Sequence, residues 1–329
     1  MRPRVIMAVA VAVILLGGGF VPAADARLTD TTTEPAARSD VTAVAADTTA
    51  ATATAAPAPV TAPPPPTLAS AQVSVQGMDD FFSWTLLDRD SGEISGAENM
   101  AATSTTQSMI KIWIAADYFR RLGDSAPSAA RKKQASIAIR DSDDRATESL
   151  FNAGGRAAVL DRMIKTCGLT DTRKKTPPGR RTVWWSYTQM SARDAVRLGE
   201  CVKSGRAAGP KWTNWILTEM TEVRGTTAKK DQHRTWSGGR WGIIEGLPEE
   251  IRAKGPVAIK NGWTLIAAVG RWHLNCLAVT DDWVLAVMMR YQGKRGLDHG
   301  ADACASVATQ LTPARPGAAL KIPVPLVQS

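Results

Sequence analysis

Residues 107–119 read QSMIKIWIAADYF, a mostly apolar run without Gly or Pro that is followed by Arg120 and Arg121. Polar residues at its start and cations at its end predict a buried helix over this stretch. Ser108 and Lys111 lie three residues apart and therefore share one face of the helix. A desolvated lysine can be the base that activates a serine nucleophile. Because S-x-x-K also arises by chance, the rest of the chain decides what the pair means.

The two ends of the chain differ from its middle. Residues 1–4 are basic, residues 5–16 are an unbroken apolar run, and Ala24-Asp25-Ala26 offers a cleavage site. This pattern predicts a secretory signal peptide, with an uncleaved membrane anchor as the alternative. The Ala-, Thr- and Pro-rich segment that follows has too few large apolar side chains to fold. The expected boundaries are a signal peptide (1–26), a disordered linker (27–71), a folded domain (72–312) and a loose Pro-rich tail (313–329).

Export would place the protein outside the cytoplasm, secreted or at the cell envelope, where cysteines form disulfides. We expect Cys167 to pair with Cys201 and Cys276 with Cys304, and buried free thiols are the alternative. No C-x-x-C occurs and the three histidines are scattered, so we expect no metal site and no cofactor. The net charge of +9 suits an anionic envelope better than nucleic acid, from which export separates the protein.

The order of the predicted elements indicates an α+β domain. A pair of strands is followed by many helices, then by three strands and a last helix. The simplest arrangement is a three-layer αβα fold in which a five-stranded antiparallel sheet, built from both ends of the domain, is flanked by helices and interrupted by an all-helical subdomain. The expected strands are 81–88, one from 94, 255–260, 274–279 and 283–290, with a hairpin at 280–282; the expected helices are the one from 108, 129–139, 144–152, 156–166, 191–203, 210–223 and 297–311.

Three short polar clusters lie at the edges of these elements. They are Ser108-Met109-Ile110-Lys111, Ser142-Asp143-Asp144 between two helices, and Lys260-Asn261-Gly262-Trp263 at the end of an apolar strand. Acyl transfer needs a nucleophile, a base, a proton relay, a cation for the substrate carboxylate and an oxyanion hole. The clusters contain residue types that can fill these roles.

S-x-x-K, S-D-N and K-T-G in this order are the signature of the serine β-lactamase and penicillin-binding protein superfamily, and the three clusters resemble them. Residues 142–155 also resemble the class A β-lactamase stretch from S-D-N to a double glycine. Residues 186–194 resemble the start of the helix after the omega loop of that class. The resemblance spans about 81–311 and is greatest to secreted actinobacterial members called serine hydrolases.

The resemblance implies a role for each matching residue. Ser108 is the acylated nucleophile and Lys111 its general base, while Ser142 relays a proton to the departing nitrogen. Lys260 supports that hydroxyl and attracts the substrate carboxylate. Gly262 lets the strand edge approach the substrate. The oxyanion hole would use the backbone N–H groups of Ser108 and of a residue just beyond Gly262.

Three departures from the family pattern affect the expected activity. Asp144 replaces an Asn and can pair with Lys111, and Asn261 replaces a Thr or Ser. The loop over 168–185 contains no Glu, the residue with which class A β-lactamases activate the deacylating water. We therefore expect acylation with slow release. The residues expected to bind the substrate are Asp144, Asn261, Gly262 and Trp263.

The sequence therefore predicts a serine hydrolase that forms a covalent acyl-enzyme on Ser108 with a β-lactam or a peptidoglycan-derived peptide. Two alternatives remain open at this point. One is a true β-lactamase that uses an unconventional base for deacylation. The other is a non-catalytic penicillin- or wall-binding module of the same fold. The sequence makes no prediction about the oligomeric state.

Overall fold

The computed structural model describes residues 67–232 and 238–313. The predicted signal peptide, nearly all of the predicted linker and nearly all of the predicted tail lie outside the described residues. Among the helices of this part of the chain, none combines the length and apolar composition of a membrane span.

One antiparallel sheet organises the domain, in the spatial order β2-β1-β8-β7-β5 with β6 also paired to β7. The hairpin expected at 280–282 joins β7 to β8, where Val279 faces Val284. A separate short sheet pairs β3 with β4. The strands are β1 (Phe81–Asp88), β2 (Ile94–Gly96), β3 (Thr103–Thr105), β4 (Gln189–Ser191), β5 (Ala258–Ile259), β6 (Gly262–Ile266), β7 (Arg271–Val279) and β8 (Trp283–Gln292).

The sheet has six strands instead of the five expected, and the physical reason is local. Ala258 faces Val279 and Gly262 faces Asn275, so β5 and β6 follow one register along β7. They form a single edge of the sheet that is interrupted only at Lys260 and Asn261. The predicted strand 255–260 therefore begins three residues before β5 and ends before β6, which it does not include. Strand β7 begins three residues before its predicted start.

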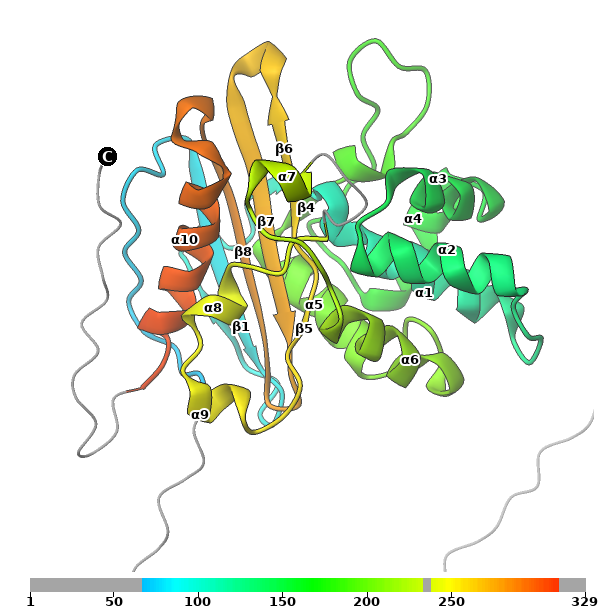
Figure 1. The fold of residues 1–329 in the computed structure, drawn as a ribbon, viewed down its shortest axis with the longest axis horizontal. Coiled ribbons are helices and arrows are strands. Elements are labelled where there is room, and N and C mark those ends of the chain that lie inside the picture. The colour runs from blue at the N-terminus through cyan, green and yellow to red at the C-terminus, as the bar shows by residue number, and fades with distance from the viewer. Residues whose placement is uncertain (1–66, 233–237, 314–329) are drawn as a thin grey trace, which may run out of the picture. The chain divides into compact units, whose positions relative to one another are not determined.

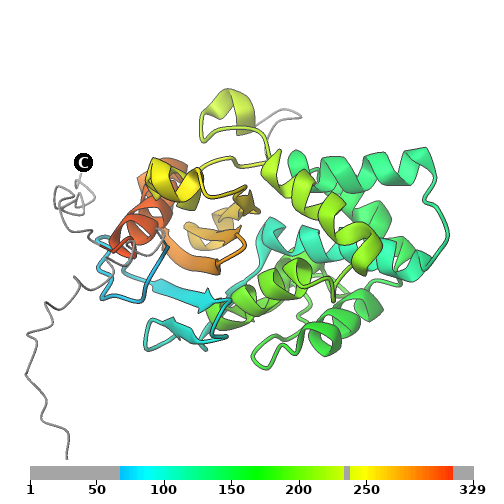
Figure 2. The same ribbon diagram turned by 90° about the horizontal axis from the view of Figure 1, so that it is seen from below.

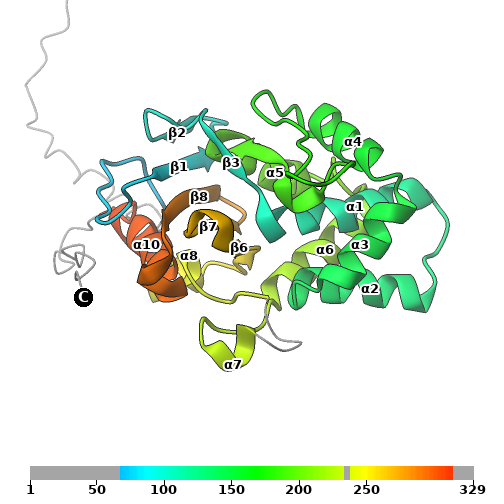
Figure 3. The ribbon, with the colours of Figure 1, turned by 90° about the horizontal axis from the view of Figure 1, so that it is seen from above.

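Helices cover both faces of the sheet (Figures 1 and 2). On one side, α8 and α10 pack against β7, while α5 packs against β1, β7 and β8 on the other (Figure 3). Gly199 permits the close approach of α5, because a Cβ there would stand 2.6 Å from Val284. The helices are α1 (Lys111–Leu122), α2 (Ala129–Arg140), α3 (Asp144–Ala153), α4 (Ala157–Cys167), α5 (Ala192–Lys203), α6 (Pro210–Thr221), α7 (Lys229–Gln232), α8 (Ile243–Gly246), α9 (Glu249–Arg252) and α10 (Gly296–Gln310).

Helix α1 is the centre of the helical region. It contacts α2, α3, α4, α5 and α6, and its residues 111–119 are all buried. The predicted helix is therefore confirmed, although it begins with a 3₁₀ turn over Gln107–Ile110. Polar partners satisfy the side chains that this burial would otherwise leave unpaired. The indole N–H of Trp113, for example, donates to the carbonyl of Val159 at 2.8 Å.

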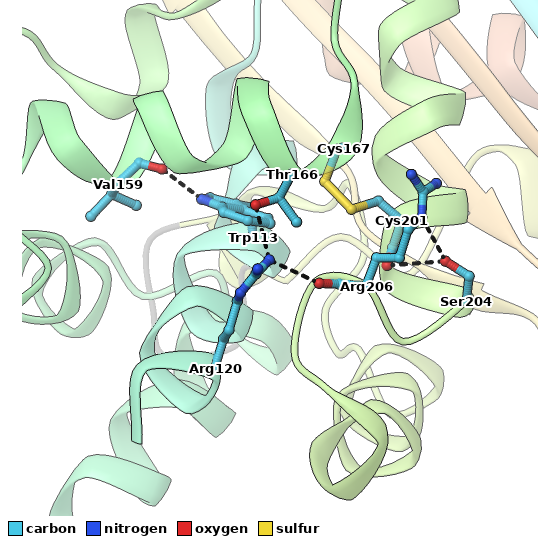
Figure 4. The surroundings of a disulfide bond; sticks show 8 residues. All are labelled: Trp113, Arg120, Val159, Thr166, Cys167, Cys201, Ser204 and Arg206. Carbon is cyan, nitrogen blue, oxygen red and sulfur yellow. Dashed lines mark hydrogen bonds between the residues drawn. A yellow bond between two sulfur atoms is a disulfide. The ribbon is translucent and has the colours of Figure 1, made fainter. Parts of the chain in front are cut away.

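Two disulfides cross-link the elements, with the pairing expected from the sequence. Cys167–Cys201 ties the end of α4 to α5, and Cys276–Cys304 ties β7 to α10. Beside the first bond, the Arg120 guanidinium donates to Thr166 Oγ1 at 2.9 Å and to the Arg206 carbonyl at 3.1 Å (Figure 4). Helix α1 is thereby tied to both halves of this cross-link.

Candidate active site

Ser108 lies in the 3₁₀ turn that leads into α1. Met109 and Ile110 beside it are fully buried, whereas Ser108 is partly exposed. The preceding residue, Gln107, has a φ of 48°, a left-handed conformation that is costly for a residue with a side chain. Its side chain is held at both ends, because it donates to Thr105 Oγ1 at 2.7 Å and accepts from Thr264 Oγ1 at 2.9 Å. These bonds fix the turn that presents Ser108 to solvent.

The structure brings three of the four predicted catalytic residues together, one from each cluster. Lys111 Nζ donates to Ser142 Oγ at 3.2 Å, and Lys260 Nζ donates to the same oxygen at 2.9 Å. Both lysine side chains are fully buried, and Ser142 is 8% exposed. Because the Ser142 oxygen accepts both bonds, its own O–H proton is free to be donated to a third group.

The chain turns sharply to place Ser142. This residue lies between α2 and α3 with a φ of 55°, a second left-handed position without a glycine. Asp143 follows as the N-cap of α3 and accepts from the Ala146 amide at 2.7 Å. A further bond, from Lys111 Nζ to the Ser142 carbonyl, holds the turn from inside the domain. The Ser142 backbone is thus fixed by the helix cap on one side and by Lys111 on the other.

Burial shifts the acid–base chemistry of both lysines. Loss of water lowers the pKa of Lys111, while the negative charge of Asp144 opposes that shift. Burial and the positive charge of Lys111 lower the pKa of Lys260 well below its usual value. Two ammonium groups that share one serine oxygen repel each other, so a neutral amine is accessible at this site. A neutral lysine amine can accept a proton from a nucleophile.

Of the predicted substrate-binding residues, Asp144 is the most accessible. Its Oδ1 accepts from Lys111 Nζ at 2.5 Å, and its side chain is 74% exposed. Trp263 is half-buried beside Trp241, and its indole N–H donates to Gln232 at 2.8 Å. Asp144 therefore contacts Lys111, one of the residues expected to perform the chemistry, and Trp263 lies on β6 next to Gly262.

Asn261, another of the predicted substrate-binding residues, makes hydrogen bonds within the protein. Its side chain is buried, with 1% exposure, and donates to the carbonyls of Gly239 and Trp241 at 2.8 Å each. Asn261 therefore ties the edge strand to the segment before α8. The amide supplies two N–H donors for these two carbonyls, whereas a Thr hydroxyl has only one.

Gly262 is required where it stands, for a reason that sequence reasoning only partly anticipated. A Cβ at this position would lie 2.6 Å from the Ser108 amide nitrogen and 2.5 Å from that of Met109. The edge strand therefore lies directly against the turn that contains Ser108 and leads into α1. This contact brings the Ser108 N–H beside β6, the arrangement that a two-amide oxyanion hole needs.

The loop over 168–185 brings an aromatic ring, and no free carboxylate, to Lys111. Its one acidic residue, Asp171, accepts from Ser191 at 2.7 Å and from Arg193 at 2.8 Å. Trp185 is buried with its ring centroid 4.9 Å from Lys111 Nζ. The indole N–H donates to Glu148 at 3.1 Å. An apolar ring thus covers one side of the predicted base.

Several residues of the site were not predicted from the sequence. Gln107 and Thr264 form part of a network in which Thr105 Oγ1 also bonds His273 Nδ1 at 2.7 Å. Burial and the nearby Arg290 lower the pKa of His273 to about 4. No local signal marks these residues, since the strands that bring them together are far apart in the chain. Among the described residues, no group of three or more His, Cys, Asp or Glu is placed to hold a metal ion.

Solved structures of β-lactamases and of a penicillin-binding protein share this architecture. A β-lactamase from Xanthomonas campestris is 16% identical, with a TM-score of 0.52 over 72% of this chain and 92% of that one. A β-lactamase from Sphaerobacter thermophilus is 18% identical, with a TM-score of 0.51 over 73% and 95%. The protein PBP-A is 17% identical, with a TM-score of 0.51 over 70% and 88%. No protein-family model and no curated protein sequence matches the chain.

The chain therefore has the fold of the serine β-lactamases and penicillin-binding proteins. This is the fold that the three clusters predicted, and the structure gathers those clusters around one serine hydroxyl.

Proposed function

We propose that this protein is a serine acyl hydrolase in which Ser108 forms a covalent acyl-enzyme with a β-lactam or a peptidoglycan-derived peptide. The observation that carries the proposal is the Ser142 hydroxyl, which accepts from both buried lysines and keeps its own proton available. In the proposed step, Ser108 Oγ bonds to the substrate carbonyl carbon and gives its proton to neutral Lys111. The carbon–nitrogen bond then breaks, and the nitrogen takes a proton through Ser142, which is resupplied by the lysines.

We propose further that the acyl group leaves slowly. Hydrolysis of the ester needs a base that holds a water molecule against the acyl carbon. The loop over 168–185 supplies no free carboxylate, and the Trp185 ring occupies one side of Lys111. Both observations support an acyl-enzyme that accumulates.

Intact mass spectrometry of the full chain after incubation with benzylpenicillin tests the acylation step. We expect one adduct with the mass of the whole penicillin, because opening the ring releases no fragment. The variant Ser108→Ala should form none, whereas Ser125→Ala, which removes an exposed serine elsewhere, should be labelled like the wild type. An adduct on Ser108→Ala would remove Ser108 from this role.

The turnover step is tested separately with nitrocefin under steady-state conditions. We expect an initial burst of about one equivalent and then little further hydrolysis, the behaviour of an enzyme that is slow to deacylate. Sustained rapid hydrolysis would instead support a true β-lactamase with an unconventional base for the water.

The engaged side chain of Asn261 and the presence of Asp144 favour one further candidate, a non-catalytic module that binds wall peptides without reacting. Such a module would form no adduct with any β-lactam.

An extracytoplasmic location, proposed from residues 1–26, is supported by the two disulfides, which persist in oxidising surroundings.

A further inference from the structure

The hydrogen bonds of the site form a chain that has a carboxylate at one end and a lysine at the other. Asp144 Oδ1 accepts from Lys111, Lys111 and Lys260 both donate to Ser142, and Lys260 lies at the far end. The anionic end is open, because the Asp144 side chain is 74% exposed. Within the described part of the chain, no donor reaches its second oxygen, Oδ2. That oxygen is therefore available to a ligand.

Among the charged residues of the segment 141–145, Asp144 is the carboxylate that is accessible to a ligand. Asp141 is buried and paired with Arg224 at 2.5 Å, and the Asp143 carboxylate caps α3. Arg145 is exposed but follows Asp144 directly on the helix, and successive helical residues do not face each other. A ligand at the open end of the site would therefore meet a carboxylate first.

A carboxylate accepts hydrogen bonds and donates none, so it cannot serve a carbonyl oxygen as an asparagine amide would. It repels an oxygen that carries negative charge and attracts N–H donors, most strongly those of an ammonium group. The replacement of Asn by Asp at this position thus changes which substituent the site favours. It does so without changing the size of the side chain.

We propose that Asp144 makes the site selective for zwitterionic acyl donors, with a carboxylate on the leaving part and an ammonium group on the acyl part. This inference rests on the proposed function, which places the leaving nitrogen at Ser142 and its carboxylate toward Lys260. The acyl part then extends toward Asp144, where the ammonium group donates to the free carboxylate oxygen. Both β-lactams and peptides can have this charge pattern.

Three penicillins with one nucleus test the proposal, because they differ at a single side-chain carbon. Ampicillin has an ammonium group there, benzylpenicillin a hydrogen and carbenicillin a carboxylate. We expect the second-order rate constant of acylation of the full chain, followed by intact mass spectrometry, to fall in that order by about three- to tenfold per step, the effect of one partly screened charge pair. Higher salt should shrink the differences.

The variant Asp144→Asn should bring the three rate constants to within about twofold of one another, since the charge that separates them is gone. Asp90→Asn removes an exposed charge in the turn after β1 and should preserve the order. Equal wild-type rates, or an unchanged order in Asp144→Asn, would overturn the selectivity while leaving acylation intact. If none of the three penicillins acylates the wild type, the proposed function itself fails and the selectivity fails with it.

Discussion

Asp144→Asn should also move the pH dependence of acylation toward acid. Asp144 is the main negative charge that stabilises the protonated form of Lys111, and it opposes the fall in the pKa of Lys111 that burial causes. An asparagine at this position keeps an oxygen to accept from Lys111 but has no charge. The pKa of Lys111 should therefore fall further, and its neutral, basic form should persist at lower pH.

The size of the shift follows from the geometry. A unit charge pair about 4 Å apart is worth about 1 kcal/mol in water and about 4 kcal/mol at an effective dielectric constant of about 20. Because the Asp144 side chain is 74% exposed, solvent screens it, and the appropriate value is near the lower end, about 1 to 2 kcal/mol. Because about 1.4 kcal/mol is a tenfold change in an equilibrium constant, the lost charge should favour the neutral amine of Lys111 by about tenfold.

The assay is the rate constant of acylation by benzylpenicillin between about pH 5 and 9, measured by quenched-flow mass spectrometry. Benzylpenicillin is the suitable substrate because its side chain is neutral, so the lost charge acts through Lys111 alone. The acid limb should shift to lower pH, and the rate on that limb should rise by up to about tenfold. Asp90→Asn should leave the limb in place. A limb that does not move, or that moves to higher pH, would refute the assignment of Lys111 as the base under the influence of Asp144.

Three further predictions concern the frame around the site. Gly262→Ala should lower the acylation rate at least tenfold and cost about 1 to 3 kcal/mol in urea denaturation, because the new methyl group would lie 2.6 Å from the Ser108 nitrogen. The pKa of His273 is about 4 in the folded chain, so below about pH 6.5 the unfolded chain binds a proton that the folded chain does not bind. The free energy of unfolding should therefore fall between about pH 6.5 and about pH 4. His273→Gln should make this fall smaller, as measured by thermal melts at several pH values. Replacing Cys276 and Cys304 together by Ser should reduce the free energy of unfolding by about 3 to 4 kcal/mol, as expected for a closed loop of this length, and a reducing agent should then have less effect on the variant than on the wild type.

The sequence predicted the elements whose signals are local. The helix from residue 129 has a serine N-cap, Ser128, and begins at the predicted residue, and the strand Phe81–Asp88 has its predicted bounds. The three motif clusters each contain residues that are close in sequence, so their chemistry could be read directly. Their meeting around Ser142 could only be inferred from the family resemblance, since Lys260 is 118 residues away from that serine.

What the sequence could not show depends on contacts between distant segments. Strand β6 was missed because residues 262–266 show no regular alternation of buried and exposed side chains, and only their pairing with β7 defines the strand. Asn261 was assigned to the substrate by its position in a motif, but its amide is engaged by two carbonyls from a segment 20 and 22 residues earlier. The motif therefore predicted the position of Asn261 in the chain, but the partners of its side-chain hydrogen bonds depend on the tertiary structure.

The burial that lowers the pKa of both lysines also restricts water. A lysine becomes a base near neutral pH only when solvent is kept from its ammonium form, and the Trp185 ring is part of the wall that does this for Lys111. On the side of Lys111 that the ring covers, the same wall also keeps a hydrolytic water from the amine. A class A β-lactamase resolves this conflict with a separate Glu for the water, a group that the loop over 168–185 lacks. Under the proposed function, the basicity required for acylation and the slow release of the acyl group would therefore have one physical cause in this site.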